Sequence, residues 1–107
     1  MIKINVKKEN NKITNINITG HAMYDVIGKD IVCSAVSSIV ITTINGILSI
    51  DDKAIEYEKS NNGLQIKDID FDDVTQKLLN NMIELLEELS NQYKENIEIK
   101  WKENHKC

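Results

Sequence analysis

The sequence contains no proline, only two cysteines among its 107 residues, and an aromatic content of 5%. It also lacks internal repeats and low-complexity segments. With 41% hydrophobic and 28% charged residues, the composition is that of a globular protein and excludes a fibrous or disordered chain. A chain of this length can build one core but not two, so we expect a single domain over residues 1–107.

The scarcity of cysteine excludes a disulfide framework. A disulfide between Cys33 and Cys107 would constrain little, because Cys107 is the last residue, so a reducing compartment is the simpler interpretation. The first ten residues, MIKINVKKEN, lack the apolar segment of a signal peptide. The most apolar run, at 39–50, is too short and too polar to span a bilayer. We expect a cytoplasmic protein without a membrane partner.

The formal net charge is −4 and the isoelectric point is about 5.1. A surface of this average charge repels phosphate backbones, so we expect no direct nucleic-acid partner. A basic protein or peptide is favoured at long range.

The first twenty residues show the alternation of a half-buried β-hairpin. Apolar residues from Ile2 to Val6 alternate with polar ones, and the pattern resumes at Ile16 after a turn-like segment at 9–12. Ile13 falls out of phase with Ile16, which indicates either a β-bulge or the beginning of the second strand.

Residues 31–50 are rich in Val, Ile and Thr, which by propensity alone would suit a strand. The length of this segment and its small residues favour a largely buried helix instead, with Asp30 as N-cap. Residues 54–59 and 64–69 flank a turn sequence and predict a second hairpin.

A second, amphipathic helix follows, capped by Asp70 or Asp72. We assign its apolar stripe to the core and not to a partner; the stripe comprises Val74, Leu78, Met82, Leu85, Leu86, Leu89 and Tyr93. Alternation at 97–101 predicts a last strand, on which we expect Trp101 to pack against a helix, although an exposed binding aromatic is the alternative. The predicted fold is an α+β sandwich of order ββαββαβ, with two helices on a mostly antiparallel sheet.

Reactive residue types gather in one stretch, GHAMYDVIGKDIVCSAVSS at 20–38. If the first hairpin ends near Gly20, His21 lies at a strand terminus. If Asp30 caps the helix, Cys33 lies in its first turn, where backbone N–H groups and the helix dipole favour an anion. The pKa of a cysteine thiol is ordinarily about 8.5 and can fall to about 3.5–7.5 in such a position. A thiolate nucleophile therefore becomes possible.

A cysteine protease needs a thiolate, an imidazole that exchanges protons, and donors for the oxyanion. His21 and the N–H groups around Cys33 could supply these parts. From the residues alone, however, the usual interpretation is an inert core cysteine and a turn histidine. Similarly, residues 22–32 could form a flap over a bound peptide or serve only as a connection.

The spacing of these residues closely resembles the signature of the ribosomal-processing cysteine protease Prp family. The matching positions are Gly20-His21-Ala22, Gly28, Asp30-Ile31-Val32-Cys33 and Ala35-Val36-Ser37. The length and the predicted element order also suit this family. The chain departs from the family pattern at Ser34, where alanine is more common, and in the variable segment 23–27.

The resemblance implies a single cysteine protease domain in which Cys33 is the nucleophile and His21 the general base and acid. It implies that Asp30 and Ser37 support the active site, that Gly20 and Gly28 shape the loop, and that no metal or organic cofactor takes part.

The implied substrate is the N-terminal extension of large-subunit ribosomal protein L twenty-seven, a basic protein, cut after paired aromatic residues in the bacterial cytoplasm. Family members are generally homodimers. Two other classes of function fit the residues. One is a non-catalytic module that docks on a ribosomal protein. The other is a thiol redox sensor, which has no obvious resolving cysteine unless Cys107 reaches Cys33.

Overall fold

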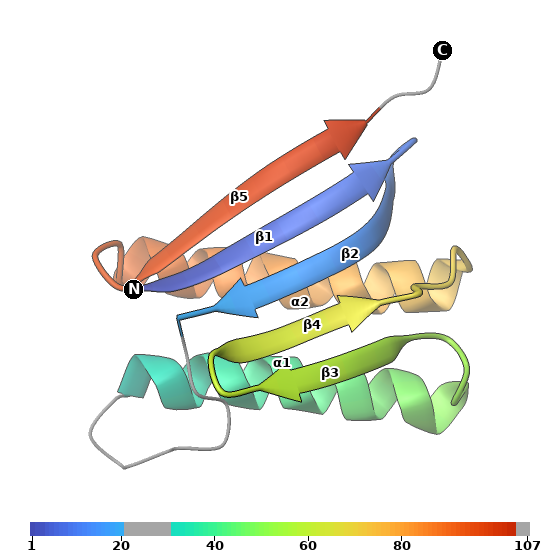
Figure 1. The fold of residues 1–107 in the computed structure, drawn as a ribbon, viewed down its shortest axis with the longest axis horizontal. Coiled ribbons are helices and arrows are strands. Elements are labelled where there is room, and N and C mark those ends of the chain that lie inside the picture. Colours follow the sequence, from blue (N-terminus) through green and yellow to red (C-terminus); the bar gives the residue numbers. More distant parts are fainter. Residues whose placement is uncertain (21–30, 105–107) are drawn as a thin grey trace.

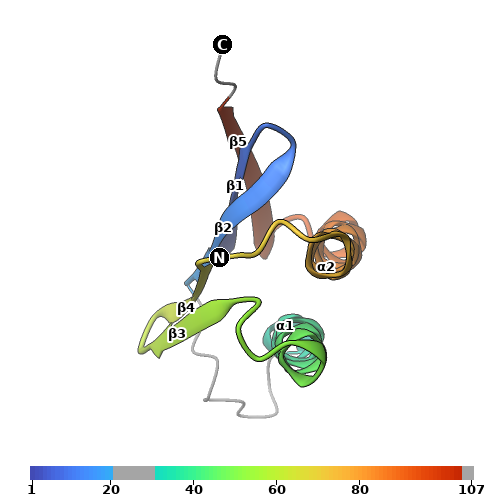
Figure 2. The same ribbon diagram turned by 90° about the vertical axis from the view of Figure 1, so that its right-hand side faces the viewer.

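The computed structural model describes residues 1–20 and 31–104. Its elements are β1 (Ile2–Glu9), β2 (Lys12–Thr19), α1 (Ile31–Ile50), β3 (Glu56–Ser60), β4 (Gly63–Lys67), α2 (Asp73–Gln92) and β5 (Ile97–Asn104). The strands form one sheet of order β3-β4-β2-β1-β5, and both helices cover the same face of it (Figure 1 and Figure 2). β1 and β5 are parallel and the other pairs are antiparallel, which confirms the predicted fold class.

The core lies between the sheet and the two helices. Strand alternation directs Ile4, Ile16 and Ile18 toward the helices, where they are buried. Val40 and Ile44 of α1 and residues of α2 belong to the same apolar cluster. Burial of each such side chain stabilises the fold by about 1.5–3 kcal/mol.

The first hairpin contains the bulge that Ile13 suggested. The β1–β2 register shifts between Lys7 and Lys8, and Ile13 is fully buried. The Gln76 side chain from α2 accepts a hydrogen bond from the Ile13 N–H (2.8 Å) and donates one to the Ile13 carbonyl (2.9 Å). A buried amide therefore satisfies the backbone groups at the irregularity.

Different residues determine the geometry of the two hairpins. Asn10 and Asn11 have φ values of 50° and 68°, as a two-residue type I′ turn requires. In the second hairpin, Gly63 lies so close to β2 that a side chain would collide with the Ile18 carbonyl. The strands of this hairpin lie nearer the turn than predicted: β3 starts at Glu56, after the buried Ala54 and Ile55, and β4 ends at Lys67.

α1 has the predicted bounds and carries no charged residue. In the described part of the chain it is the one helix that is long and apolar enough to cross a membrane. The buried core helix of a globular domain can have the same length and composition. Val36, Val40, Ile44 and Ile47 bury one side of it in the core.

α2 begins after Asp72, whose carboxylate accepts a hydrogen bond from the Thr75 N–H at 3.1 Å. Asp72, and not Asp70, is therefore the N-cap. The predicted apolar stripe is wrong in part, because Val74 and Leu85 are 49% and 40% exposed. Met82 and Leu86 of the predicted stripe are buried, and Leu78, Leu89 and Tyr93 are partly buried against the core. The complete set of buried residues in α2 is Thr75, Gln76, Leu79, Met82, Ile83 and Leu86. The hydrogen bonds between Gln76 and Ile13 hold α2 in one rotation about its own axis. The spacing of apolar residues alone does not reveal this rotation.

The prediction that Trp101 packs against a helix is also wrong, because its side chain is 43% exposed. Ile97 at the start of β5 is buried, but the later part of the strand extends beyond both helices (Figure 2). The Lys8 ammonium lies 4.7 Å from the centroid of the Trp101 ring, so a cation–π contact takes the place of helix packing.

Candidate active site

The end of β2 and the start of α1 lie at the same end of the molecule (Figure 1). Gly20 directly follows β2 with a φ of 79°, and a side chain there would collide with the Met1 carbonyl. Only glycine combines this left-handed conformation with so close an approach. Gly20 therefore fixes where the chain leaves the sheet.

Cys33 is the third residue of α1 and lies in its first turn, as predicted. Its side chain is half-buried against the core and carries a thiol, not a disulfide. Backbone N–H groups and the helix dipole at this end favour a negative charge over a neutral group. The position suits a thiolate that still reaches solvent.

Ser37 lies one helical turn beyond Cys33 and is buried. Residues four apart share a helix face, so Ser37 lies behind Cys33 on the inward side of α1. Its burial suits a supporting role better than direct contact with a substrate.

His21, Gly28 and Asp30 lie outside the described residues. The His21–Cys33 pair, the Asp30 cap and the flap therefore stay predictions. Ile31 and Val32, which the flap was to include, belong to α1.

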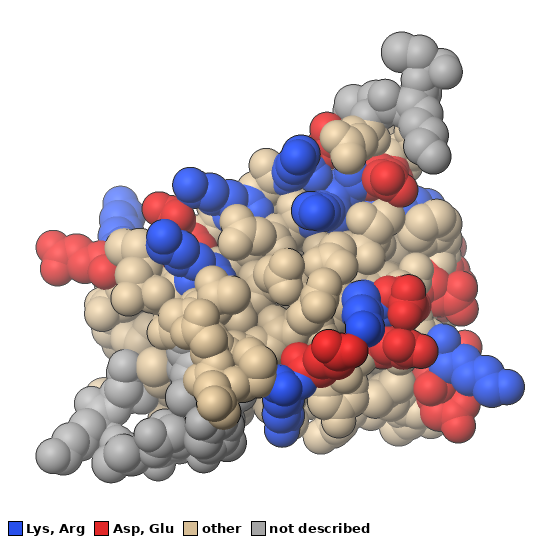
Figure 3. Space-filling model, viewed as in Figure 1, with Lys and Arg blue, Asp and Glu red and all other residues tan. Residues whose placement is uncertain are grey.

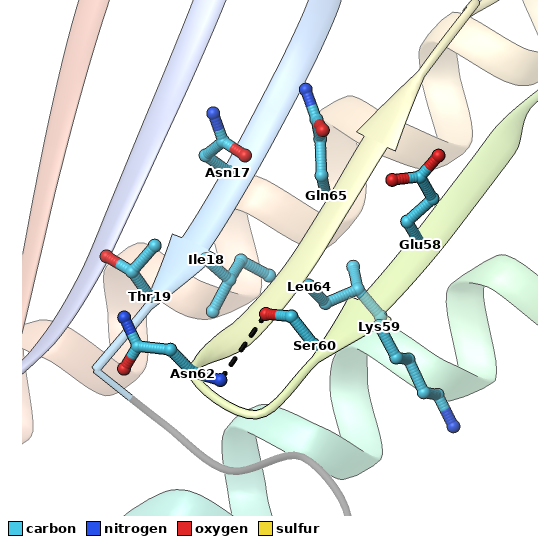
Figure 4. Close-up of a pocket in the computed structure, with 9 residues that line it drawn as sticks. All are labelled: Asn17, Ile18, Thr19, Glu58, Lys59, Ser60, Asn62, Leu64 and Gln65. Atoms are coloured by element: carbon cyan, nitrogen blue, oxygen red, sulfur yellow. Dashed lines mark hydrogen bonds between the residues drawn. The ribbon is translucent and has the colours of Figure 1, made fainter.

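A hollow of about 190 Å³, which the sequence did not reveal, lies where β2 ends beside the β3–β4 hairpin, and most of the residues that line it are polar (Figure 4). Thr19 and Asn17 line it from β2, and Gln65 and Ser60 from the hairpin. Strand alternation places these side chains on the sheet face away from the helices, since their neighbours are buried. The hollow can form hydrogen bonds with a peptide near the end of β2.

Comparisons with known proteins identify the family and the fold. The family model described as cysteine protease Prp matches residues 1–98. The ribosomal processing cysteine protease Prp of Staphylococcus aureus is 27% identical over 106 residues, which cover 95% of this chain and all of that protein.

Two solved structures have the same fold. The crystal structure of the essential ribosomal processing protease Prp from S. aureus with a substrate peptide has a TM-score of 0.83 at 25% identity, over 95% of this chain and all of that one. SMU.848 from Streptococcus mutans also has a TM-score of 0.83, at 20% identity, over 97% of this chain and 96% of that one. This second likeness shows the fold alone.

The fold and the family match define a cysteine protease, an enzyme that hydrolyses peptide bonds. The chain belongs to the cysteine protease Prp family, as its residues at 20–37 indicated.

Proposed function

We propose that this protease removes the N-terminal extension of large-subunit ribosomal protein L twenty-seven during ribosome assembly. The observation that carries the proposal is the half-buried Cys33 thiol in the first turn of α1, in a chain whose family processes peptides. The S. aureus relative is named a ribosomal processing protease and aligns over its whole length. The net charge of −4 favours a basic substrate at long range.

The reaction is acyl transfer. The Cys33 thiolate attacks the scissile carbonyl carbon, so a carbon–sulfur bond forms as the carbon–nitrogen bond breaks. The His21 imidazolium gives its proton to the departing amine and then takes one from the water that hydrolyses the thioester. N–H groups at the start of α1 stabilise the oxyanion.

The other motif residues support this pair. Asp30 caps α1, orients His21, or does both, since a nearby carboxylate favours the imidazolium form. Ser37 supports the turn that carries Cys33, while Gly20 and Gly28 shape the segment between strand and helix.

The functional unit in this proposal is a cytoplasmic homodimer. The support for a dimer is the surface of α1, which lacks charge over its whole length and exposes 73% of Ile31. Size-exclusion chromatography with light scattering tests it: a dimer mass is expected, and a monomer at working concentration contradicts it.

Mass spectrometry of a peptide that spans the extension of this organism's own ribosomal substrate tests the proposed function. Wild-type protein is expected to make one cut after the paired aromatic residues, and Cys33→Ala none. Ser34→Ala, which restores the more common family residue next to the nucleophile, is the matched control and should cut normally. A wild-type protein that binds the peptide without cutting it would indicate a docking module instead.

A further inference from the structure

The sheet face away from the helices carries a cluster of lysines at one side. Lys3 and Lys7 lie on β1 and Lys100 and Lys102 on β5, all exposed. Their neighbours in β1 are buried toward the helices, so alternation places these lysines on the opposite face. Figure 3 views this face and shows basic side chains gathered over β1 and β5. We call these four residues the lysine face.

The register brings these charges together. Lys7 is directly opposite Lys102, Lys100 is opposite the neutral Asn5, and Lys3 is opposite Glu98. Like charges directly opposite one another destabilise a sheet. Within the described part of the chain, Lys100 is the only one of the four in an ion pair, with Glu98 at 3.6 Å. Glu98 thus lies beside Lys3 and Lys100, whereas the stability of the sheet does not explain the like-charged pair of Lys7 and Lys102.

Protection of a sheet edge explains only part of it. β5 is an edge strand, and lysines on an edge prevent pairing with other chains. β1, however, is an interior strand between β2 and β5, so Lys3 and Lys7 protect no edge. The opposite edge strand, β3, carries Glu56 and Glu58 on this face instead. On that side Lys67 of β4 forms an ion pair with Glu58, so among the described residues of this face, lysines without a nearby carboxylate are concentrated on β1 and β5.

Neutral amides lie beside the lysine face. The register places Asn5 opposite Asn17, and Asn17 opposite Gln65, in a row that continues from Lys100. An open hollow of about 500 Å³ is lined by Lys7, Lys100, Lys102 and two of these asparagines, among others. Ammonium groups with adjacent amides are the groups that proteins use to contact phosphates and sugars.

We propose that the lysine face binds the phosphate backbone of single-stranded RNA. The expectation of no nucleic-acid partner came from the net charge, which averages over the whole chain, whereas on this face β1 and β5 carry four lysines against two glutamates, Glu9 and Glu98. The choice of RNA over an acidic peptide rests on the proposed ribosomal function, because a ribosomal substrate lies on a particle rich in RNA. The lysine face itself does not depend on that function.

Fluorescence anisotropy with a labelled single-stranded RNA of about twelve nucleotides tests the proposal. The variant Lys7→Gln/Lys102→Gln removes two charges from the lysine face. Lys77→Gln/Lys94→Gln is the matched control, because it changes the net charge equally at two exposed lysines on and after α2. We expect about tenfold weaker binding in the first variant, and a change below about threefold in the control.

Salt dependence provides a second readout. If three or four phosphates are neutralised, log K falls with log salt with a slope of about −2 to −3 for a single strand. Removal of two contacts should make that slope about 1.4 shallower. Equal loss in both variants, or a salt slope near zero, would overturn the proposal. A glutamate-rich peptide that binds as tightly as the RNA would reassign the face to an acidic protein.

Peptide cleavage measured on the same preparations separates this proposal from the proposed function. Lys7→Gln/Lys102→Gln should cleave the isolated peptide at the wild-type rate, which also shows that it is folded. RNA binding by a wild-type protein that cuts no peptide would remove the proposed function and leave the lysine face intact.

Discussion

The two helices have the same length of 20 residues but very different construction. α2 begins with a capping Asp72 and holds the β-bulge at Ile13 through Gln76. α1 has no acidic residue in its first turn, no charge anywhere, and a half-buried thiol at its third residue. The stabilising cap and side-chain hydrogen bonds are thus seen on α2, whereas the candidate nucleophile is on α1. Substitutions in the two helices should separate these contributions.

The largest expected effect is on activity and comes from α1. Cys33→Ala should lower kcat/KM for the peptide by about 10³-fold or more, because no other group replaces the nucleophile. Its urea midpoint should change little, since the side chain is small and only half-buried. A matching loss of stability and activity would instead make Cys33 a core residue.

The largest expected effect on stability comes from the core of α2. Leu86→Ala should lower the free energy of unfolding by about 2–5 kcal/mol, because its side chain is fully buried. The adjacent Leu85, at 40% exposed, is the control, and Leu85→Ala should cost about 1 kcal/mol or less. Urea denaturation measures both. Equal costs would contradict the rotation of α2 described above.

A smaller effect is expected at the bulge. Gln76→Ala should destabilise the protein by about 1–3 kcal/mol, because the Ile13 N–H and carbonyl lose their partner in the core. Gln76→Leu restores volume without hydrogen bonds and should be similarly unstable. Recovery of stability in Gln76→Leu would show that packing, and not the bonds, matters at this position.

The smallest effect is expected at the cap of α2. Hydrogen bonds from Thr75, first from its side chain and then from its backbone, hold the pKa of Asp72 below its ordinary value of 3.8. A carboxyl whose pKa is lowered by folding stabilises the protein above that ordinary value and loses this contribution as pH falls through the folded-state pKa. Asp72→Asn should therefore lower the melting temperature slightly at neutral pH and not in strong acid. A difference that persists in strong acid would contradict the account.

Local patterns predicted much of this molecule from its sequence. The bounds of α1 and the turn at Asn10 depend on near neighbours in the chain, and the structure has both. Of the two alternatives that the sequence left open at Ile13, the structure has the bulge. The position of Cys33 in the first turn follows from those bounds. The exposure of Trp101 did not follow, because it depends on how far β5 extends past the helices.

Other features depend on contacts between distant segments. The rotation of α2 depends on the bond between Gln76 and Ile13, and the lysine face on the parallel register of β1 and β5. Within the candidate site, the sequence and the structure agree on Gly20, Cys33 and Ser37 as positions at a strand end and in a helix. The relation of His21 to Cys33 depends on residues 21–30 and stays a prediction.

Detection of an acyl-enzyme tests the central claim, that Cys33 is the nucleophile, most directly. The protein is mixed with the substrate peptide, quenched in acid during turnover, and analysed by intact mass spectrometry followed by peptide mapping. The account predicts an adduct with the mass of the acyl fragment on Cys33, labile to hydroxylamine as a thioester is. Efficient cleavage with no such adduct, together with undiminished cleavage by Cys33→Ala, would contradict it.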